Sequence, residues 1–245
     1  GQDVFADMAF GIWKDAGVNP EITQPDGAAT GAAYIFGEEA SGNNALIICP
    51  GVAATISPSD VEARADIIAS SSVFVTQLEQ PIDSAVRALE VARAGGATTI
   101  LNPAPAAELP DAIYPSCDFV TPNESEAESL TGIAVTDPPS AKRAARVFLD
   151  FGVRSVLITL GEKGSFLYDG LGDGVHTPAL SAGPVVETTG AGDAFNGGFA
   201  VALSEGMSPA EACRFAAATA GLSVTRSGTA PSMPMRSEID ALLEG

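Results

Sequence analysis

A glycine-rich turn that leads into an acidic residue is the stretch of this sequence best suited to chemistry. Gly190, Ala191, Gly192 and Asp193 follow one another, and apolar residues then recur at the spacing of one helix face up to Leu203. Small residues let backbone N–H groups converge on a phosphate, and the positive end of a helix dipole favours the same negative charge. The carboxylate of Asp193 could accept a proton from a hydroxyl nucleophile. A helix N-terminus with Asp193 as a local cap explains the same residues without a ligand.

The composition excludes several classes of protein. With 245 residues and 46% hydrophobic content, the chain can bury one substantial core. It has no apolar run of about 18 residues that would span a membrane, and no charged and then apolar stretch predicts export. The formal net charge of −19 argues against a nucleic-acid partner, because a phosphate backbone requires clustered Lys and Arg. Three widely spaced cysteines are typical of reduced thiols, so we expect a cytoplasmic protein.

Segments with helix and strand patterns alternate along most of the chain. Residues 4–16 have a helical pattern, and residues 30–36 and 45–49 predict a β-hairpin with a polar loop. Further along we expect strands at 73–78, 98–101, 119–120 and 156–160, with helices at 82–92, 124–130, 141–148 and 212–224. Strands that are apolar on both faces and alternate with helices indicate an α/β fold with a mainly parallel sheet covered by helices.

Polar residues follow the expected strands at the point where each strand ends. Glu79, Asn102, Asn123 and Gly161 come shortly after four successive strands. In open α/β sheets ligands bind at this carboxyl edge, so we expect the four strand ends to share a cleft with the turn at Asp193. Each residue also has an ordinary explanation, because Asn before Pro is a common turn and Asn often caps a helix.

Several of these runs together resemble one known family. The turn at residues 190–193, the run Asn102-Pro103-Ala104-Pro105 and the segment Thr121-Pro122-Asn123-Glu124-Ser125-Glu126 are similar, in order, to motifs of the ribokinase family, the PfkB-type carbohydrate kinases. The resemblance extends from Gly1 to near Leu243 and implies a ribokinase-like fold with a small β lid. It implies that Asp193 is the general base and also contacts the sugar, and that the amides of Gly190, Ala191 and Gly192 form an anion hole.

The resemblance also assigns residues to the sugar, the nucleotide and Mg²⁺. Glu79 corresponds to a contact with sugar hydroxyl groups, which suits a carboxylate because it can accept two hydrogen bonds. Glu126 would contact Mg²⁺ through water, although a solvated helix face explains it equally well. Lys163 could be a charge near the phosphates or could point to solvent. The full set implied for ATP is Asn123, Thr159, Leu160, Gly161, Glu162, Lys163, Gly164 and Gly192.

A monovalent cation, K⁺ in this family, is a further implication of the resemblance. Its ligands would be Glu187, Thr189, Ser223, Arg226, Gly228 and Ser232, mostly through backbone carbonyl groups. The family usually has Asp where Glu187 stands, so the cation site would differ in size or affinity. Residues 30–49 would form part of the lid, through which family members pair as homodimers.

Family members carry an N-terminal segment before the point at which this sequence opens. We therefore expect residues 1–245 to form a single ribokinase-like domain without the first strand and part of the lid. The expected function is ATP-dependent phosphoryl transfer to the primary hydroxyl of a pentose, D-ribose to ribose 5-phosphate. The alternatives are a kinase of the same fold for a nucleoside, a ketohexose phosphate or a sugar acid, and a non-catalytic module for nucleotide binding or dimerisation.

Overall fold

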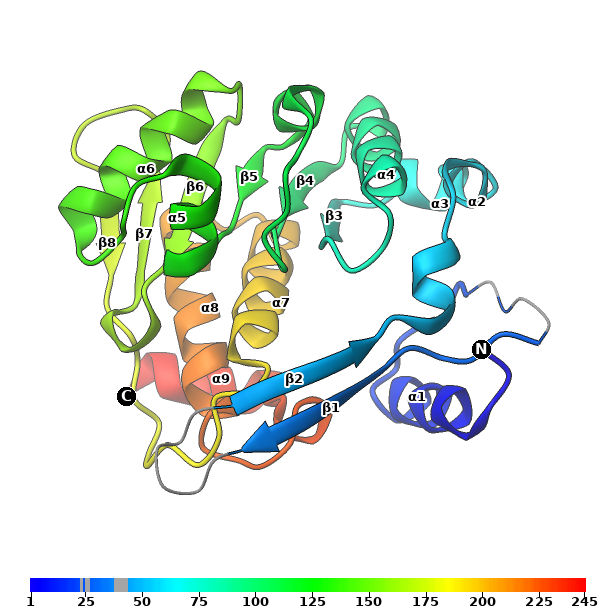
Figure 1. Cartoon of the computed structure of the whole chain (residues 1–245). Coiled ribbons are helices and arrows are strands. Elements are labelled where there is room, and N and C mark those ends of the chain that lie inside the picture. The colour runs from blue at the N-terminus through cyan, green and yellow to red at the C-terminus, as the bar shows by residue number, and fades with distance from the viewer. Residues whose placement is uncertain (23, 25–26, 38–43) are drawn as a thin grey trace.

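A six-stranded sheet forms the centre of the molecule (Figure 1). The computed structural model describes residues 1–22, 24, 27–37 and 44–245. The strands lie in the order β3, β4, β5, β6, β7 and β8, with β3 to β6 parallel to one another and β7 and β8 antiparallel to their neighbours. Their bounds are Val73–Thr76, Thr98–Leu101, Phe119–Val120, Ser155–Thr159, Ser165–Tyr168 and Val175–Thr177. The predicted α/β fold with a mainly parallel sheet is confirmed.

Alternating side chains of the strands point into two cores, one on each face of the sheet. Leu101 and Val120 pack in the first core, whereas their neighbours Ile100 and Phe119 pack in the second. This alternation follows from the two-residue period of a strand, and it explains why the strands are apolar throughout. The first core is covered by α4, α5 and α6, which are Ile82–Gly95, Glu124–Thr131 and Pro138–Asp150. The second is covered by α7, α8 and α9, which are Ala191–Ser204, Pro209–Ser223 and Arg236–Glu244.

The first third of the chain lies beside the β3 edge of the sheet. It comprises helix α1 (Val4–Asp15), the antiparallel hairpin β1 (Ala32–Gly37) and β2 (Asn44–Cys49), the short helix η1 (Gly51–Thr55), and helices α2 (Pro58–Glu62) and α3 (Ala65–Ala69). Buried Val61 in α2 packs on α4. The hairpin extends apart from the main sheet (Figure 1). The polar loop predicted between its strands falls at residues 38–43, outside the described residues.

Most predicted elements have the expected positions, but their extent differs in places. The strand predicted at 73–78 ends at Thr76 because the chain turns there, with the Leu78 amide donating to Ala104 O. Helices α2, α3 and α9 and the antiparallel strands β7 and β8 were not predicted. Among the described residues, no helix is both long enough and apolar enough to cross a membrane.

Candidate active site

The glycine-rich turn has the backbone conformation that only glycine adopts readily. Gly190 immediately precedes α7 and has φ +81°, in the left-handed region. A Cβ atom at this position would lie 3.3 Å from Cγ2 of Thr229, so the turn packs against the loop that leads to the short helix η4 (Ala230–Ser232). The glycine therefore serves both the left-handed turn and the close approach of this loop.

The start of α7 leaves two amide donors open. The Ala191 amide donates to Thr188 O at 3.1 Å and is engaged within the turn. Among the described residues, the amides of Gly192 and Asp193 have no acceptor, and no side chain caps the helix. Unpaired amides at a helix N-terminus are suited to holding an anion. Of the three predicted anion-hole amides, those of Gly190 and Gly192 have no acceptor among the described residues, and Asp193 supplies a further donor that was not predicted.

The carboxylate of Asp193 faces a small cavity at the carboxyl edge of the sheet. The cavity has a volume of about 280 Å³ and is lined by Val75, Thr76, Gln77, Asn102, Asp193, Asn196 and Gly197. Gln77 Nε2 donates to Asp193 Oδ1 at 3.2 Å and to Asn102 Oδ1 at 2.9 Å. The ends of β3 and β4 and the first turn of α7 thus meet in one place, as predicted for Asn102 and Asp193.

Buried hydrogen bonds connect this cavity to the next strand. Asn102 Nδ2 donates to Thr121 O at 2.8 Å, and Thr121 Oγ1 donates to Asn196 Oδ1 at 2.7 Å. Asn196 Nδ2 in turn donates to Gly192 O at 3.0 Å. Asn102, Thr121 and Asn196 are all buried. Because buried amide and hydroxyl groups are costly to leave unpaired, these bonds hold the start of α7 against the ends of β4 and β5.

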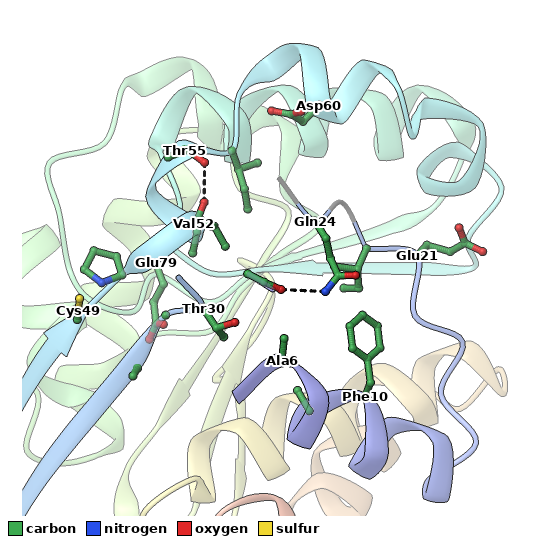
Figure 2. Close-up of a pocket in the computed structure, with 18 of the residues that line it drawn as sticks. Ala6, Phe10, Glu21, Gln24, Thr30, Cys49, Val52, Thr55, Asp60 and Glu79 are labelled. Atoms are coloured by element: carbon green, nitrogen blue, oxygen red, sulfur yellow. Dashed lines mark hydrogen bonds between the residues drawn. The ribbon is translucent and has the colours of Figure 1, made fainter. Parts of the chain in front are cut away.

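Glu79 lies in a second and larger cavity. This cavity has a volume of about 1130 Å³ and is lined mainly by apolar residues of α1, the hairpin, η1 and α3. Figure 2 shows Glu79 close to the base of the hairpin, with Ala6 and Phe10 of α1 farther across the cavity. Gln77, two residues before Glu79, reaches Asp193. The two cavities share no lining residue, so the structure does not place Glu79 and Asp193 in one cavity, as the predicted shared cleft required.

Asn123 and Glu126 form a capping box at the start of α5. The Asn123 side chain accepts from the Glu126 amide at 2.9 Å, and the Glu126 carboxylate accepts from the Asn123 amide at 2.9 Å and from Asn123 Nδ2 at 2.8 Å. Burial raises the pKa of Glu126, and the hydrogen bonds from Asn123 oppose that rise. Asn123 therefore caps the helix, which was the simpler of its two explanations.

The segment predicted to contact ATP follows β6 as a short turn. Thr159 ends β6, and its amide donates to Pro122 O at 3.0 Å, so the segment lies next to the end of β5. Gly161 and Gly164 have φ +53° and +95°, as the turn η3 (Gly161–Lys163) requires. Lys163 Nζ donates to Thr136 O at 2.9 Å, on the connection between α5 and α6. The ammonium group is thus held by a backbone carbonyl and is exposed.

The two loops predicted to hold a monovalent cation lie together. Glu187 accepts from the Gly228 amide at 2.8 Å, and the amides of Val186 and Glu187 both donate to Val224 O. The Arg226 guanidinium pairs with Glu238 of α9, so its side chain is engaged elsewhere. Ser223 and Ser232 donate their hydroxyl groups to the carbonyls of Ala220 and Thr229. The same loop also packs against Gly190, which connects the predicted cation loops to the start of α7.

Comparison with known proteins identifies the family of this chain. Residues 1–236 match the family described as pfkB family carbohydrate kinase. The chain belongs to this family. It is 41% identical over 216 residues to a ribokinase from Haemophilus influenzae, covering 88% of this chain and 69% of that protein. It is 35% identical over 236 residues to a deoxyribokinase from Salmonella typhi, covering 96% of this chain and 76% of that protein.

A solved structure gives the same result for the fold. A ribokinase from Arabidopsis thaliana, determined in complex with ribose and ATP, superposes with a TM-score of 0.90 at 31% identity, covering 100% of this chain and 80% of that one. The family, the ribokinase-like fold and the enzyme class predicted from the sequence are therefore confirmed. This pfkB family protein is a phosphotransferase, a sugar kinase.

Two residues of the candidate site were not predicted from the sequence. Gln77 contacts Asp193 directly, and Asn196 holds the backbone at Gly192, yet neither was predicted. A signal for Asn196 was present, because it follows Asp193 by three residues and so falls on the same face of the helix. Gln77 had a weaker signal, as a polar residue directly after an apolar strand.

Proposed function

We propose that this kinase transfers the γ-phosphoryl group of ATP to the primary hydroxyl of a pentose, converting D-ribose to ribose 5-phosphate. The observation that carries the proposal is the position of Asp193 in the first turn of α7, beside the unpaired amides of Gly192 and Asp193 and facing a cavity. A carboxylate there accepts the proton of the attacking hydroxyl, while the amides stabilise charge on the transferred group. Similarity to ribokinases, one of them bound to ribose and ATP, supports the choice of substrates.

The residues after β5 and β6 support ATP as the donor. Asn123 and the turn at residues 159–164 follow neighbouring parallel strands, at the same edge as Asp193. Glycine at 161 leaves space for a phosphate near the backbone, whereas Gly164 packs closely against the backbone of residues 177–179. Gly192 would contribute its amide to the same phosphate group. Lys163 would act only if it left Thr136, so we assign it a minor role.

Glu126 is suited to a water-mediated contact with Mg²⁺. Both of its carboxylate oxygens already accept hydrogen bonds from Asn123, and each retains a lone pair for a water molecule. Mg²⁺ keeps most of its water ligands when it binds to proteins, so a contact through water is sufficient. Such an ion would neutralise charge on the phosphates.

The loops around Glu187 and Gly228 would hold the monovalent cation. Hydrogen bonds join the two loops, and carbonyl oxygens would be the ligands, because the positively charged guanidinium of Arg226 has no acceptor for a cation and pairs with Glu238. The proposed set remains Glu187, Thr189, Ser223, Arg226, Gly228 and Ser232.

The chain would act as one domain in which the hairpin at residues 30–49 closes over the sugar and pairs with a second copy as a homodimer. Tyr34, Ile47 and Ile48 expose more than half of their surface on this hairpin.

2-Deoxyribose is a second candidate substrate, because a deoxyribokinase is also among the relatives. A panel of D-ribose, 2-deoxyribose, a nucleoside, a ketohexose phosphate and a sugar acid distinguishes these substrates. We expect the highest kcat/KM for D-ribose, measured by ADP release, with phosphate on the primary hydroxyl in the product. ATP binding without sugar-dependent ADP release would instead indicate a non-catalytic module.

The variant Asp193→Asn tests the role of the base. We expect it to lower kcat by about 10²–10⁴ because proton acceptance is lost, while ATP binding measured by calorimetry is unchanged. The matched control is Asp150→Asn at the end of α6, where the chain leads into the opposite edge of the sheet. Near-normal turnover in Asp193→Asn would refute the assignment.

A further inference from the structure

The Asp193 carboxylate is held by a neighbouring side chain whose orientation the structure determines. Gln77 Nε2 donates to Asp193 Oδ1 at 3.2 Å, whereas Oδ2 has no hydrogen bond within the described residues. One oxygen of the carboxylate is thus engaged by the protein, and the other is free for a hydroxyl group. Gln77 reaches this position from the first residue after β3, 116 residues away in the sequence.

The Thr121 carbonyl determines the orientation of the Gln77 amide, through the Asn102 side chain that lies between them. The Thr121 carbonyl can only accept a hydrogen bond, so Asn102 must direct Nδ2 toward it, as observed at 2.8 Å. Asn102 Oδ1 therefore faces Gln77 and can only accept, which directs Gln77 Nε2 toward it at 2.9 Å. Both N–H groups of the Gln77 amide are then used, one by Asn102 and the other by Asp193. The reverse orientation would bring the Gln77 oxygen against two acceptors.

Asn102 is well suited to be the rigid member of this pair. It is 8% exposed, and its backbone amide also donates to Thr76 O at 2.9 Å, which continues the parallel pairing of β3 and β4. Side chain and backbone are therefore both held. Gln77 is partly exposed and depends on Asn102 for its conformation.

We infer that Gln77, oriented by Asn102, is a positioning residue that fixes the Asp193 carboxylate for proton acceptance. The inference rests on the proposed role of Asp193 as the base. Without the Gln77 donor, the short Asp193 side chain would rotate away from the reacting hydroxyl, and the productive geometry would be populated less often. Nucleotide binding would not change, because the Gln77 side chain bonds Asn102 and Asp193 and none of the proposed ATP contacts, which are Gly192 and residues that follow β5 and β6.

The variant Gln77→Met tests this inference, because methionine keeps the length of the side chain and removes both donors. We expect kcat to fall by about 10- to 100-fold, as for loss of a hydrogen bond to a charged group, with the KM for ATP unchanged. The matched control is Gln80→Met on the same connection. Gln80 Nε2 donates to Thr76 Oγ1 and Gln77 O, both at 2.7 Å, and its amide does not reach Asp193. Equal losses in the two variants would mean that the connection is merely disrupted, and the inference would be wrong.

A double-mutant cycle separates this inference from the proposed function. In an Asp193→Asn background, Gln77→Met should cause no further loss of kcat, because the base on which it acts is already absent. A further loss of the same size would show that Gln77 acts on the substrate or the fold, and would overturn the positioning role. If Asp193→Asn alone retained normal turnover, the assignment of Asp193 as the base would be wrong, whatever the effect of Gln77→Met. If Asp193→Asn were inactive and Gln77→Met had normal turnover, only the positioning role of Gln77 would be wrong.

Discussion

Close packing of α7 on α8 makes Gly198 a sensitive position in the helix that carries Asp193. A Cβ atom on Gly198 would lie 2.6 Å from Thr219 Oγ1, 3.0 Å from Thr219 Cβ and 3.1 Å from Ala216 Cα. Thr219 is 7% exposed, and its hydroxyl donates to Phe215 O at 2.9 Å, so it cannot move aside without losing that bond. The added methyl group must therefore separate the two helices or disturb α8.

The neighbouring glycine provides the control, because a Cβ atom on Gly197 would meet no atom within 4 Å apart from the nearby backbone of its own helix. Replacing glycine by alanine inside a helix gains about 1 kcal/mol at either position. Overpacking costs about 1–3 kcal/mol and applies only to Gly198→Ala. The difference in the free energy of unfolding between the two variants thus isolates the packing cost. For a chain of this size it corresponds to about 2–12 °C in Tm.

Urea and thermal unfolding followed by circular dichroism measure this difference. We expect Gly197→Ala to be slightly more stable than the parent protein and Gly198→Ala to be less stable than Gly197→Ala by the packing cost. Gly198→Ala should also lower kcat, since a displaced α7 moves Asp193 relative to the end of β3. Equal stability of the two variants, within about 0.5 kcal/mol, would refute the close contact with Thr219.

Two further predictions concern titratable groups. Hydrogen bonds from the backbone and hydroxyl of Thr30 and from a helix amide lower the pKa of Asp3 to about 2 from 3.8, so its contribution to stability is present above pH 3.8 and is lost as the pH falls through about 2. Asp3→Asn should lower the free energy of unfolding at neutral pH, as measured by urea titration. Between pH 4 and 2 this free energy should decrease less in the variant than in the parent protein; the same pH dependence in both would contradict the prediction. Burial raises the pKa of Cys117 and Cys213 to about 12, whereas Cys49 is exposed. A thiol reagent at pH 8 should therefore modify one cysteine in the native protein and three after unfolding; two or more rapidly modified in the native protein would contradict the burial.

The sequence by itself predicted the alternation of strands and helices and the glycine turn before the helix that carries Asp193. These features are local, because helix and strand periods and the need for glycine at a left-handed turn depend on residues close together in the chain. The strands at residues 98–101 and 119–120 agree with the structure at both ends. The sequence also predicted the capping of α5 by Asn123 as one of two explanations for this residue, the other being a contact with ATP.

Only the tertiary structure decided which side chains meet. Gln77 and Asp193 are 116 residues apart, and Thr121 and Asn196 are 75 apart, so their hydrogen bonds depend on strand order, register and the packing of α7 on the sheet. The same holds for the antiparallel pairing of β7 and β8, and for the direction of Lys163 toward Thr136. Such contacts form because distant segments bury their apolar faces together, and a local pattern carries no information about the partner that completes them.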